Sequence, residues 1–383
     1  MNKEPFYFGA SSSAHQVEGG QSNDWTEWEA RTGHERSGRA TDHWSRYEED
    51  FDIAKKLGHN AHRFSIEWSR IEPEEGRFDE KALAHYRDVV RALRKRGMEP
   101  FVTLWHFTLP QWVAREGGWE SEKTAHHFAR YVGRVAAYLK DDVKFWMPLN
   151  EPEIYSTMAY LVGKWPPAAR NPLRMVWVLL CLARAHRAAY AVLKGIRPEA
   201  QVGIAKNHIY FEAIGKNQWN EALKAVADWG WNFFFLDRVK DSLDFIGVNF
   251  YFHNRIDGWF NKNKNERVSD MGWELLPETI FHALKDLNKY KKPMYVTENG
   301  LADAADRYRA EYICEALEAI AHARREGVEV RGYLHWALTD NFEWADGFVP
   351  RFGLVEIDYK TLARHVRPSA LAYRDMIKKW PNR

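Results

Sequence analysis

Two kinds of segment alternate along the chain: short runs dense in β-branched and aromatic residues, and longer stretches with apolar residues at helical spacing. Successive runs begin 37 to 57 residues apart, which leaves room for a crossover helix and its loops between parallel strands. The runs predict eight strands, at Phe6–Ser11, His62–Trp68, Glu99–Trp105, Lys144–Asn150, Gln201–Asn207, Leu243–Tyr251, Lys292–Asn299 and Val330–Leu338.

The longer stretches carry residues typical of helix ends. In one of them, Asp79 precedes a stretch in which Leu83, Val90 and Leu93 recur at helical spacing, and Gly97 follows it. An aspartate accepts hydrogen bonds from the first turn of a helix, and a glycine readily adopts the left-handed conformation that ends one. This pattern predicts a helix between Asp79 and Gly97, and related patterns occur in other segments.

Strands that alternate with helices predict a parallel sheet, and several of the runs are nearly continuous apolar sequences, as in strands buried on both faces. No linker rich in proline, glycine or serine divides the chain. We therefore predict a single (β/α)8 TIM barrel domain over residues 1–383, with the active site at the C-terminal ends of the strands. A doubly wound open sheet is the alternative.

Composition and charge exclude several classes of function. The chain has 55 basic and 53 acidic residues, with the two signs interspersed, so no basic face for nucleic acid is expected. The longest apolar run, Met175–Ala183, is far shorter than the roughly 20 residues that span a bilayer. The first residues do not resemble a secretion signal. We expect a cytoplasmic protein without a membrane span, and leave a homo-oligomer open.

No motif for a nucleotide, a phosphate or a metal occurs, so neither a cofactor nor a metal is expected. Aromatic residues are abundant, however, at 15% of the chain, and 18 of them are tryptophan. Tryptophan offers a large apolar face and one polar N–H group. An excess of this residue therefore calls for an explanation beyond packing.

Polar and aromatic residues are dense where the expected strands end, which is where catalytic side chains lie in a barrel of this kind. The strand ends carry Trp105–His106, Asn150–Glu151, Asn207–His208, Asn249–Tyr251, Glu298–Asn299 and His335–Trp336. Two carboxylates, those of Glu151 and Glu298, are therefore expected to face one mouth from the fourth and seventh strands.

This set of side chains suits a neutral, polyhydroxylated ligand. Amide, imidazole and carboxylate groups bond hydroxyls, and the C–H face of a sugar ring stacks on an indole. Glycoside hydrolysis uses a pair of carboxyls, one to protonate the leaving oxygen and the other to attack or to activate water. The sequence predicts this reaction, with a non-catalytic carbohydrate-binding barrel as the alternative. A variant that transfers the sugar to an acceptor instead of water also stays open.

At this point the chain resembles glycoside hydrolase family 1, the retaining β-glycosidases, over nearly its whole length. The motifs that carry the resemblance are Gln16–Gly19, Asp42–Trp44, Arg63–Ile71, Trp105–Phe107, Leu149–Pro152, Asn249–Tyr251, Thr297–Gly300 and Asp340–Gly347. The order of the motifs makes the resemblance specific. His335 before Trp336 is similar to archaeal and thermophilic members.

The resemblance implies a role for each matching residue. Glu151 matches the acid/base and Glu298 the nucleophile of a double displacement through a covalent glycosyl-enzyme. The residues expected to support them are Arg63, Asn150, Asn249 and Tyr251, with Asn150 on the 2-hydroxyl of the sugar and Arg63 and Tyr251 on the nucleophile. The residues expected to bind substrate are Gln16, His106, Trp336, Glu343, Trp344 and Phe352 on the sugar side and Trp273 on the aglycone side.

Physical chemistry makes separate demands on the two glutamates. Glu298 must stay ionised, which a neighbouring cation and phenol favour. Glu151 must hold a proton near neutrality, so its pKa should be raised by partial burial and by the charge of Glu298. Once the glycosyl-enzyme forms, that charge is lost, and Glu151 can act as the base.

The resemblance also narrows the substrate. Members that act on 6-phosphorylated sugars carry Ser, Lys and Tyr where this chain has Glu343, Pro350 and Phe352. A carboxylate at position 343 would repel a phosphate, so terminal β-D-glycosyl residues without phosphate are expected, of glucoside, galactoside or fucoside type. The chain is shorter than most relatives, and the loss is expected in 207–243 and around 253–271. We expect a more open entrance that admits bulky or lipid-like aglycones.

Overall fold

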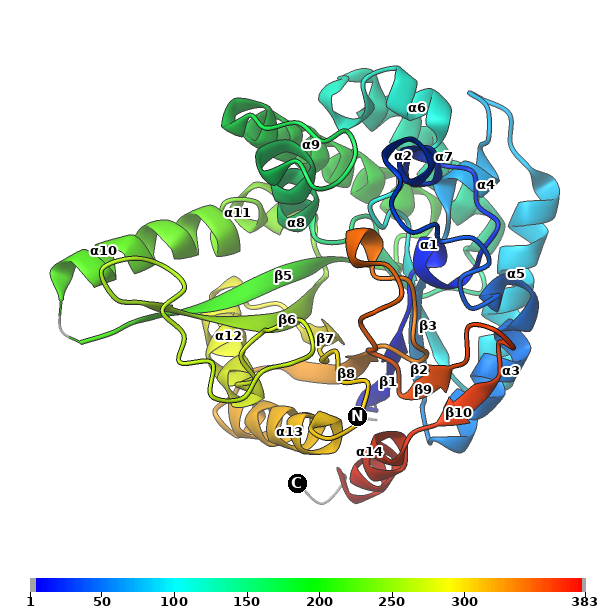
Figure 1. Ribbon diagram of the computed structural model, residues 1–383. Helices are drawn as coiled ribbons and strands as arrows, with labels where there is room; N and C mark the ends of the chain where they lie inside the picture. Colours follow the sequence, from blue (N-terminus) through cyan, green and yellow to red (C-terminus); the bar gives the residue numbers. More distant parts are fainter. Residues whose placement is uncertain (1–4, 216, 381–383) are drawn as a thin grey trace.

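The computed structural model describes residues 5–215 and 217–380. Eight parallel strands form a closed barrel in sequence order, and helices surround it (Figure 1). The barrel strands are β1 (Tyr7–Ser11), β2 (Ala61–Ser65), β3 (Glu99–Thr103), β4 (Phe145–Met147), β5 (Gln201–Ala213), β6 (Phe245–Ile256), β7 (Met294–Glu298) and β8 (Val330–Trp336). The (β/α)8 prediction is confirmed, and the doubly wound alternative is wrong, because β1 pairs with both β2 and β8 and the sheet has no edge.

Helices and a small hairpin complete the fold. The α-helices are α1 (Ala14–Val17), α2 (Asp24–Thr32), α3 (His43–Lys56), α4 (Trp68–Ile71), α5 (Glu80–Lys95), α6 (Gln111–Arg115), α7 (Lys123–Leu139), α8 (Pro152–Ser156), α9 (Pro172–Ile196), α10 (Gln218–Ala227), α11 (Leu236–Val239), α12 (Ile280–Leu287), α13 (Arg309–Arg325) and α14 (Pro368–Lys379). The shorter 3-10 helices are η1 (Gly118–Glu120), η4 (Lys240–Ser242), η5 (Pro277–Thr279), η6 (Asn288–Tyr290) and η7 (Trp344–Asp346), and η2 (Thr157–Val162) and η3 (Asp228–Phe233) are π-helical. After β8, the strands β9 (Val355–Ile357) and β10 (Arg364–Val366) pair antiparallel.

The helix expected between Asp79 and Gly97 is α5. The Asp79 side chain accepts hydrogen bonds from the backbone N–H groups of Lys81 and Ala82, at 2.8 and 3.1 Å. Gly97 follows the helix with a φ of 72°, the left-handed conformation that glycine tolerates best. Leu83 and the other predicted apolar positions of this helix are buried against the barrel.

Strands β5 and β6 run beyond the barrel wall. They pair in parallel from Gly203 and Phe245 to Ala213 and Ile256, and Figure 1 shows them extending away from the barrel together with α10. The expected ends at Asn207 and Tyr251 were therefore wrong for these two strands. They continue because each supplies the hydrogen-bond partner of the other, a pairing that no single run reveals. We call β5–β6 beyond the barrel, with α10, the arm.

An aromatic layer fills the barrel interior below the mouth. The rings of Phe101 and Phe145 stack with centroids 4.3 Å apart, and Phe245 and Tyr295 pack around them. Gly203 makes room for this layer, since a Cβ atom there would lie 2.5 Å from the ring of Phe245. The barrel interior is thus a packed core rather than a pore.

Helix α9 is the one helix among residues 5–215 and 217–380 whose length and composition would suffice to cross a membrane. Half of its most apolar stretch is buried inside the protein, where it packs against α7 and neighbouring elements. The core helix of a folded protein has the same composition, so α9 is weak evidence for a membrane span.

Candidate active site

The two predicted carboxyls lie at the C-terminal mouth of the barrel. Glu298 is the last residue of β7, and Glu151 follows β4 and precedes the first turn of α8. The backbone of Glu151 has a φ of 39°, in the left-handed region, and its N–H group is bonded to the carbonyl of Ala205 at 2.8 Å. Non-glycine residues in this region cost energy and cluster at functional sites. Both carboxyls are buried, with exposures of 7% for Glu151 and 4% for Glu298.

Both oxygens of Glu298 accept hydrogen bonds, one from a buried donor and one from a partly buried donor. Arg63, on β2, donates Nη1–H to Oε1, and Tyr251, on β6, donates its hydroxyl to Oε2 at 2.8 Å. Burial and the charges of Glu298 and Glu151 raise the pKa of Tyr251 well above its usual value, so the phenol keeps its proton. This environment suits an ionised carboxylate held in one orientation.

Glu151 has a different environment, with amides in place of a cation. Asn249 and Asn207 both donate their Nδ2–H groups to Oε1, at 3.0 and 3.1 Å. Burial raises the pKa of Glu151 to about 8, with further contributions from the charges of Glu298 and Glu153. The carboxyl therefore carries a proton at neutral pH, and Oε2, which accepts no hydrogen bond from the described residues, is free to present it.

A continuous chain of hydrogen bonds joins the two carboxyls. Asn249 also donates to Oδ1 of Asn150 at 3.2 Å, and the same oxygen accepts Nη2–H of Arg63 at 2.6 Å. Arg63 then reaches Glu298. The four residues predicted to support the glutamates thus lie together, and each contacts a carboxyl or its immediate neighbour.

The predicted sugar-side residues line the same mouth. Gln16, in α1, donates Nε2–H to Oε2 of Glu343 at 3.1 Å and to the carbonyl of Phe342 at 2.8 Å. His106 lies 3.2 Å, Nε2 to Nδ2, from Asn150. Its Nδ1 is buried without a hydrogen-bond partner among the described residues. Gln16 and His106 thus lie beside Glu343 and Asn150 at the mouth.

The two predicted indoles flank His106. Trp336 and Trp344 lie nearly parallel to its ring, with centroids 6.0 and 5.9 Å away. Trp344 also stacks on His15 at 5.4 Å. Phe352 packs with Trp336 in one buried cluster. These rings form an apolar wall beside the polar groups, the combination that a sugar ring requires.

Glu343 differs from the expectation in one respect. Burial, Asp346 and Glu298 raise its pKa to about 8, so at neutral pH this carboxyl is largely protonated rather than a fixed negative charge. The predicted repulsion of a phosphate by a carboxylate at position 343 needs this correction. What disfavours a phosphate is the nature of the nearby groups, because Gln16 and a neutral carboxyl supply no cation.

Trp273 packs against the sugar-side cluster of the mouth, with its ring centroid 6.0 Å from that of Phe352. Its ring is 5.9 Å from that of Tyr251 and 4.6 Å from that of Phe252. It lines a cavity of about 410 Å3 at the base of the arm, together with Ile154, Ile209, Trp231, Phe252, His253, Asn254, Asn261, Asn263, Asn265, Gly272 and Glu274. The 253–271 region, expected to be shortened, therefore still borders a cavity.

Several neighbours of the site were missing from the predicted set. Asn207 was visible as a polar residue at a strand end, and its contact with Glu151 could have been proposed on that ground. Trp231 gave no such signal, because it comes from η3, which follows α10, and reaches Oδ1 of Asn207 with its N–H group at 3.1 Å. Lys206 and Glu153 form a buried ion pair beside these residues. Only the tertiary structure brings the four together.

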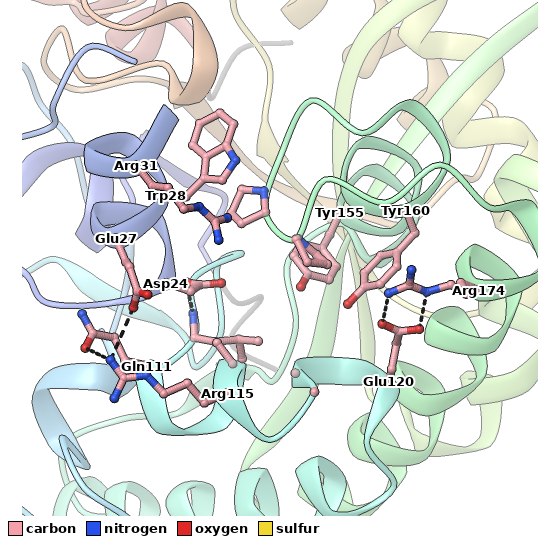
Figure 2. Close-up of a pocket in the computed structure, with 16 residues that line it drawn as sticks. Asp24, Glu27, Trp28, Arg31, Gln111, Arg115, Glu120, Tyr155, Tyr160 and Arg174 are labelled. Carbon is pink, nitrogen blue, oxygen red and sulfur yellow. Dashed lines mark hydrogen bonds and ion pairs between the residues drawn. The ribbon is translucent and has the colours of Figure 1, made fainter. Parts of the chain in front are cut away.

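A second cavity, of about 350 Å3, lies outside this site (Figure 2). Asp24, Tyr155 and Tyr160 line it, and ion pairs join Glu120 to Arg174 and Glu27 to Arg115 at its edge. Neither Glu151 nor Glu298 borders it. Trp25 and Trp165, each next in sequence to a residue that lines this cavity, pack against Trp344. An aromatic layer thus stands between the cavity and the sugar side of the mouth.

No group of three or more His, Cys, Asp or Glu side chains suited to a metal ion occurs in residues 5–215 and 217–380. At the mouth of this (β/α)8 barrel, one carboxyl carries a proton and a second is held by a guanidinium and a phenol, beside a wall of indoles. This combination is typical of a glycoside hydrolase.

The chain belongs to glycosyl hydrolase family 1, whose family model matches residues 2–240 and 236–381. It is an O-glycosyl hydrolase of the β-glycosidase type. β-Glucosidase A of Thermotoga maritima is 31% identical, covering 98% of this chain and 97% of the relative, and a β-galactosidase of Pyrococcus woesei is also 31% identical over 98% and 97%. The alignment with the Thermotoga enzyme spans 435 positions against 383 residues here, so that relative is longer, as expected.

Solved structures agree with the sequence relatives. A β-glycosidase from Pyrococcus horikoshii superimposes with a TM-score of 0.92 at 38% identity, covering 98% of this chain and 94% of that one. A β-glucosidase from Thermotoga maritima in complex with glucoimidazole has a TM-score of 0.92 at 30% identity, with 98% of both chains covered. The resemblance to thermophilic and archaeal members is therefore confirmed.

Proposed function

We propose that this protein hydrolyses terminal, non-reducing β-D-glycosyl residues with retention of configuration, through a covalent glycosyl-enzyme. The observation that carries the proposal is the contrast between the two carboxyls. Glu298 is held by Arg63 and Tyr251, whereas burial and nearby charges raise the pKa of Glu151 to about 8. One is prepared to attack as an anion and the other to donate a proton.

In the first half-reaction, an oxygen of Glu298 attacks the anomeric carbon and forms an ester bond with it. The bond between that carbon and the glycosidic oxygen breaks, and the oxygen takes the proton of Glu151 and leaves as an alcohol. Tyr251 and Arg63 hold the attacking carboxylate in place. Because the attack falls on the face opposite the leaving group, the configuration is inverted in this step.

In the second half-reaction, water enters on the side that the leaving group vacated. Glu298 is now an ester without charge, so one of the causes that raised the pKa of Glu151 has gone. The Glu151 carboxylate accepts a proton from the water, whose oxygen attacks the anomeric carbon as the ester bond breaks. The second inversion restores the original configuration, and both carboxyls return to their first states. An acceptor sugar in place of water gives transglycosylation.

The sugar side supports a neutral glycone. Gln16 and Glu343 offer hydrogen bonds to hydroxyl groups, and the cluster of Trp336 and Phe352 offers an apolar surface. The proposed substrates are glucosides, galactosides and fucosides whose sugar carries no phosphate. On the aglycone side, the cavity bordered by Trp273 provides space for a bulky leaving group, which includes a lipid-like one.

A panel of aryl β-glycosides tests the proposal on wild type and on Glu298→Gly, with and without azide. We expect the variant to be inactive alone and to form an α-glycosyl azide when azide occupies the space of the missing carboxylate. Unchanged turnover by the variant would overturn the role of Glu298. A wild-type protein that binds these glycosides without cleaving them would instead support a carbohydrate-binding barrel.

A further inference from the structure

A buried ion pair lies directly behind Glu151. Lys206, on β5, places Nζ 2.8 Å from Oε1 of Glu153, on α8, and the side chains are 0% and 4% exposed. Lys206 also donates to the backbone carbonyl of Asn207. Oε2 of Glu153 has no hydrogen-bond partner among the described residues. A lysine and a glutamate are thus enclosed at the base of the arm, with an incomplete set of partners.

Such a pair is an unusual way to stabilise a barrel. Removing two charges from water costs several kcal/mol per ion, and well-packed apolar side chains often serve equally well or better. Burial lowers the pKa of Lys206 and raises that of Glu153, which is the direction expected when desolvation opposes both charges. Stability alone therefore gives little reason for this pair.

The pair is connected to the acid/base by two routes. The first runs through Asn207, whose carbonyl accepts from Lys206 while its side chain donates to Oε1 of Glu151 at 3.1 Å. The second is the chain itself, because Glu153 lies two residues after Glu151 in the first turn of α8. A shift of either ion would move the acid/base carboxyl or its amide partner.

Glu153 and Lys206 also act on Glu151 through their charges. Glu153 is the third cause of the raised pKa of Glu151, after burial and Glu298, and Lys206 interacts with Glu151 in the opposite sense. The other charged group that acts on Glu151 is Glu298, which is held by Arg63 and Tyr251. His208, the next ionisable residue along β5, has a pKa lowered by burial, with the charge of Lys206 contributing, so it adds no cation near neutrality.

We propose that Lys206 and Glu153 are positioning residues of the reaction: the pair fixes Asn207 against Glu151 and holds the charge of Glu153 two residues from the acid/base. The inference rests on the proposed role of Glu151 as the acid/base. In this arrangement Glu153 raises the proton affinity of the acid, while Lys206 keeps Glu153 ionised in the protein interior.

The variant Glu153→Gln tests the charge, because it keeps the shape and removes the anion. The readout is kcat/KM against pH for a phenyl β-glycoside, whose poor leaving group needs the acid. The alkaline limb of this profile is the fall in kcat/KM at high pH, where Glu151 loses its proton. We expect it to move to lower pH by roughly one unit. A 2,4-dinitrophenyl glycoside needs little protonation of its leaving group, so its kcat/KM below neutral pH should be nearly unchanged. Glu326→Gln, in the exposed Lys285–Glu326 pair, is the matched control.

The double variant Glu153→Gln/Lys206→Gln covers the case in which the single variant does not fold, since no unpaired charge is left buried. Its alkaline limb should lie between those of the single variant and wild type, because Glu153 affects Glu151 more than Lys206 does. A folded variant with an unmoved limb, or with both substrates slowed equally, would overturn the proposal. If wild type itself showed no alkaline limb in kcat/KM, the result would instead count against Glu151 as the acid/base.

Discussion

The hydroxyl of Tyr251 lies 2.8 Å from Oε2 of Glu298 and donates a hydrogen bond to it. The two residues come from neighbouring parallel strands, β6 and β7, whose register shifts after Val248 so that Asn249 pairs with Glu298. Because Arg63 occupies the other carboxylate oxygen, the phenol fixes the remaining rotation of the carboxylate about its last bond. The orientation of the attacking group is therefore set before substrate arrives, which is the condition for electrostatic preorganisation.

Tyr251→Phe removes this one hydrogen bond and leaves the ring in place. A bond to a charged group is worth about 1.5–3 kcal/mol, so kcat/KM for an aryl β-glycoside should fall by about 10- to 100-fold. Steady-state kinetics at constant pH measure the loss. Tyr290→Phe is the control, because that hydroxyl also donates to a carboxylate at 2.8 Å, that of Asp237, far from the barrel mouth. Equal losses in the two variants would contradict the role of Tyr251.

The pKa of about 8 at Glu151 predicts the alkaline limit of activity. The group is protonated below that pH and loses its proton above it, so kcat/KM should fall as pH rises through about 8. In Glu151→Gln the limb should disappear, and kcat/KM for phenyl glycosides should drop by roughly 10²–10⁴-fold. Glu122→Gln, in an exposed pair with Arg184, should keep the wild-type profile. An alkaline limb that survives in Glu151→Gln would assign it to another group.

Asn207→Ala should move the alkaline limb of the kcat/KM profile to higher pH, opposite to the shift expected for Glu153→Gln. Its amide donates to the carboxyl of Glu151 and lowers the pKa of that group, so its loss should raise the pKa and carry the limb to higher pH. The pH profile of kcat/KM is again the measurement. Asn217→Ala, which removes an exposed cap at the start of α10, is the control. A downward shift would show that the amide favours the protonated acid.

The aglycone cavity predicts a tolerance for large leaving groups. Among alkyl β-glycosides, whose leaving groups are alike in acidity, kcat/KM should not decline as the alkyl chain lengthens. Trp273→Ala should weaken long-chain substrates most, because its ring borders the cavity. Trp259→Ala, which changes an exposed indole beyond β6, should have no such effect. A steep fall of wild-type kcat/KM from short to long alkyl chains would contradict the open entrance.

Gly300→Ala should damage the mouth through the backbone. A Cβ atom at Gly300 would lie 2.0 Å from the carbonyl oxygen of Trp336, so the end of β8 has to move. We expect a loss of about 1–3 kcal/mol in stability, as for overpacking in a core, together with weaker sugar binding. Thermal unfolding and KM measure the two effects. Gly195→Ala, in α9 with open space around it, should be neutral or stabilising. A Gly300→Ala protein as stable and active as wild type would refute the steric argument.

The fold could be predicted because the barrel strands have local sequence signals. Several are nearly continuous apolar runs, and helix ends such as Asp79 carry their own hydrogen-bond signal. The arm was not predicted, because β5 and β6 continue by pairing with each other over residues that lie beyond the two predicted strands. Glu151 and Glu298 could be predicted from their positions at strand ends and from their motifs. Trp231 and the Lys206–Glu153 pair could not, because their role depends on which elements meet behind the acid/base.

What the sequence determined by itself was therefore the architecture, the family resemblance and the two carboxyls, since these follow from local patterns and from their order along the chain. The tertiary structure decided the state of those carboxyls. A glutamate has the same side chain wherever it occurs, and its proton affinity depends on burial and on neighbouring charges. Two amides, the charge of Glu298 and a buried ion pair act on Glu151, whereas Arg63 and Tyr251 hold Glu298. Folding assigns different chemistry to two identical residues by giving them different surroundings.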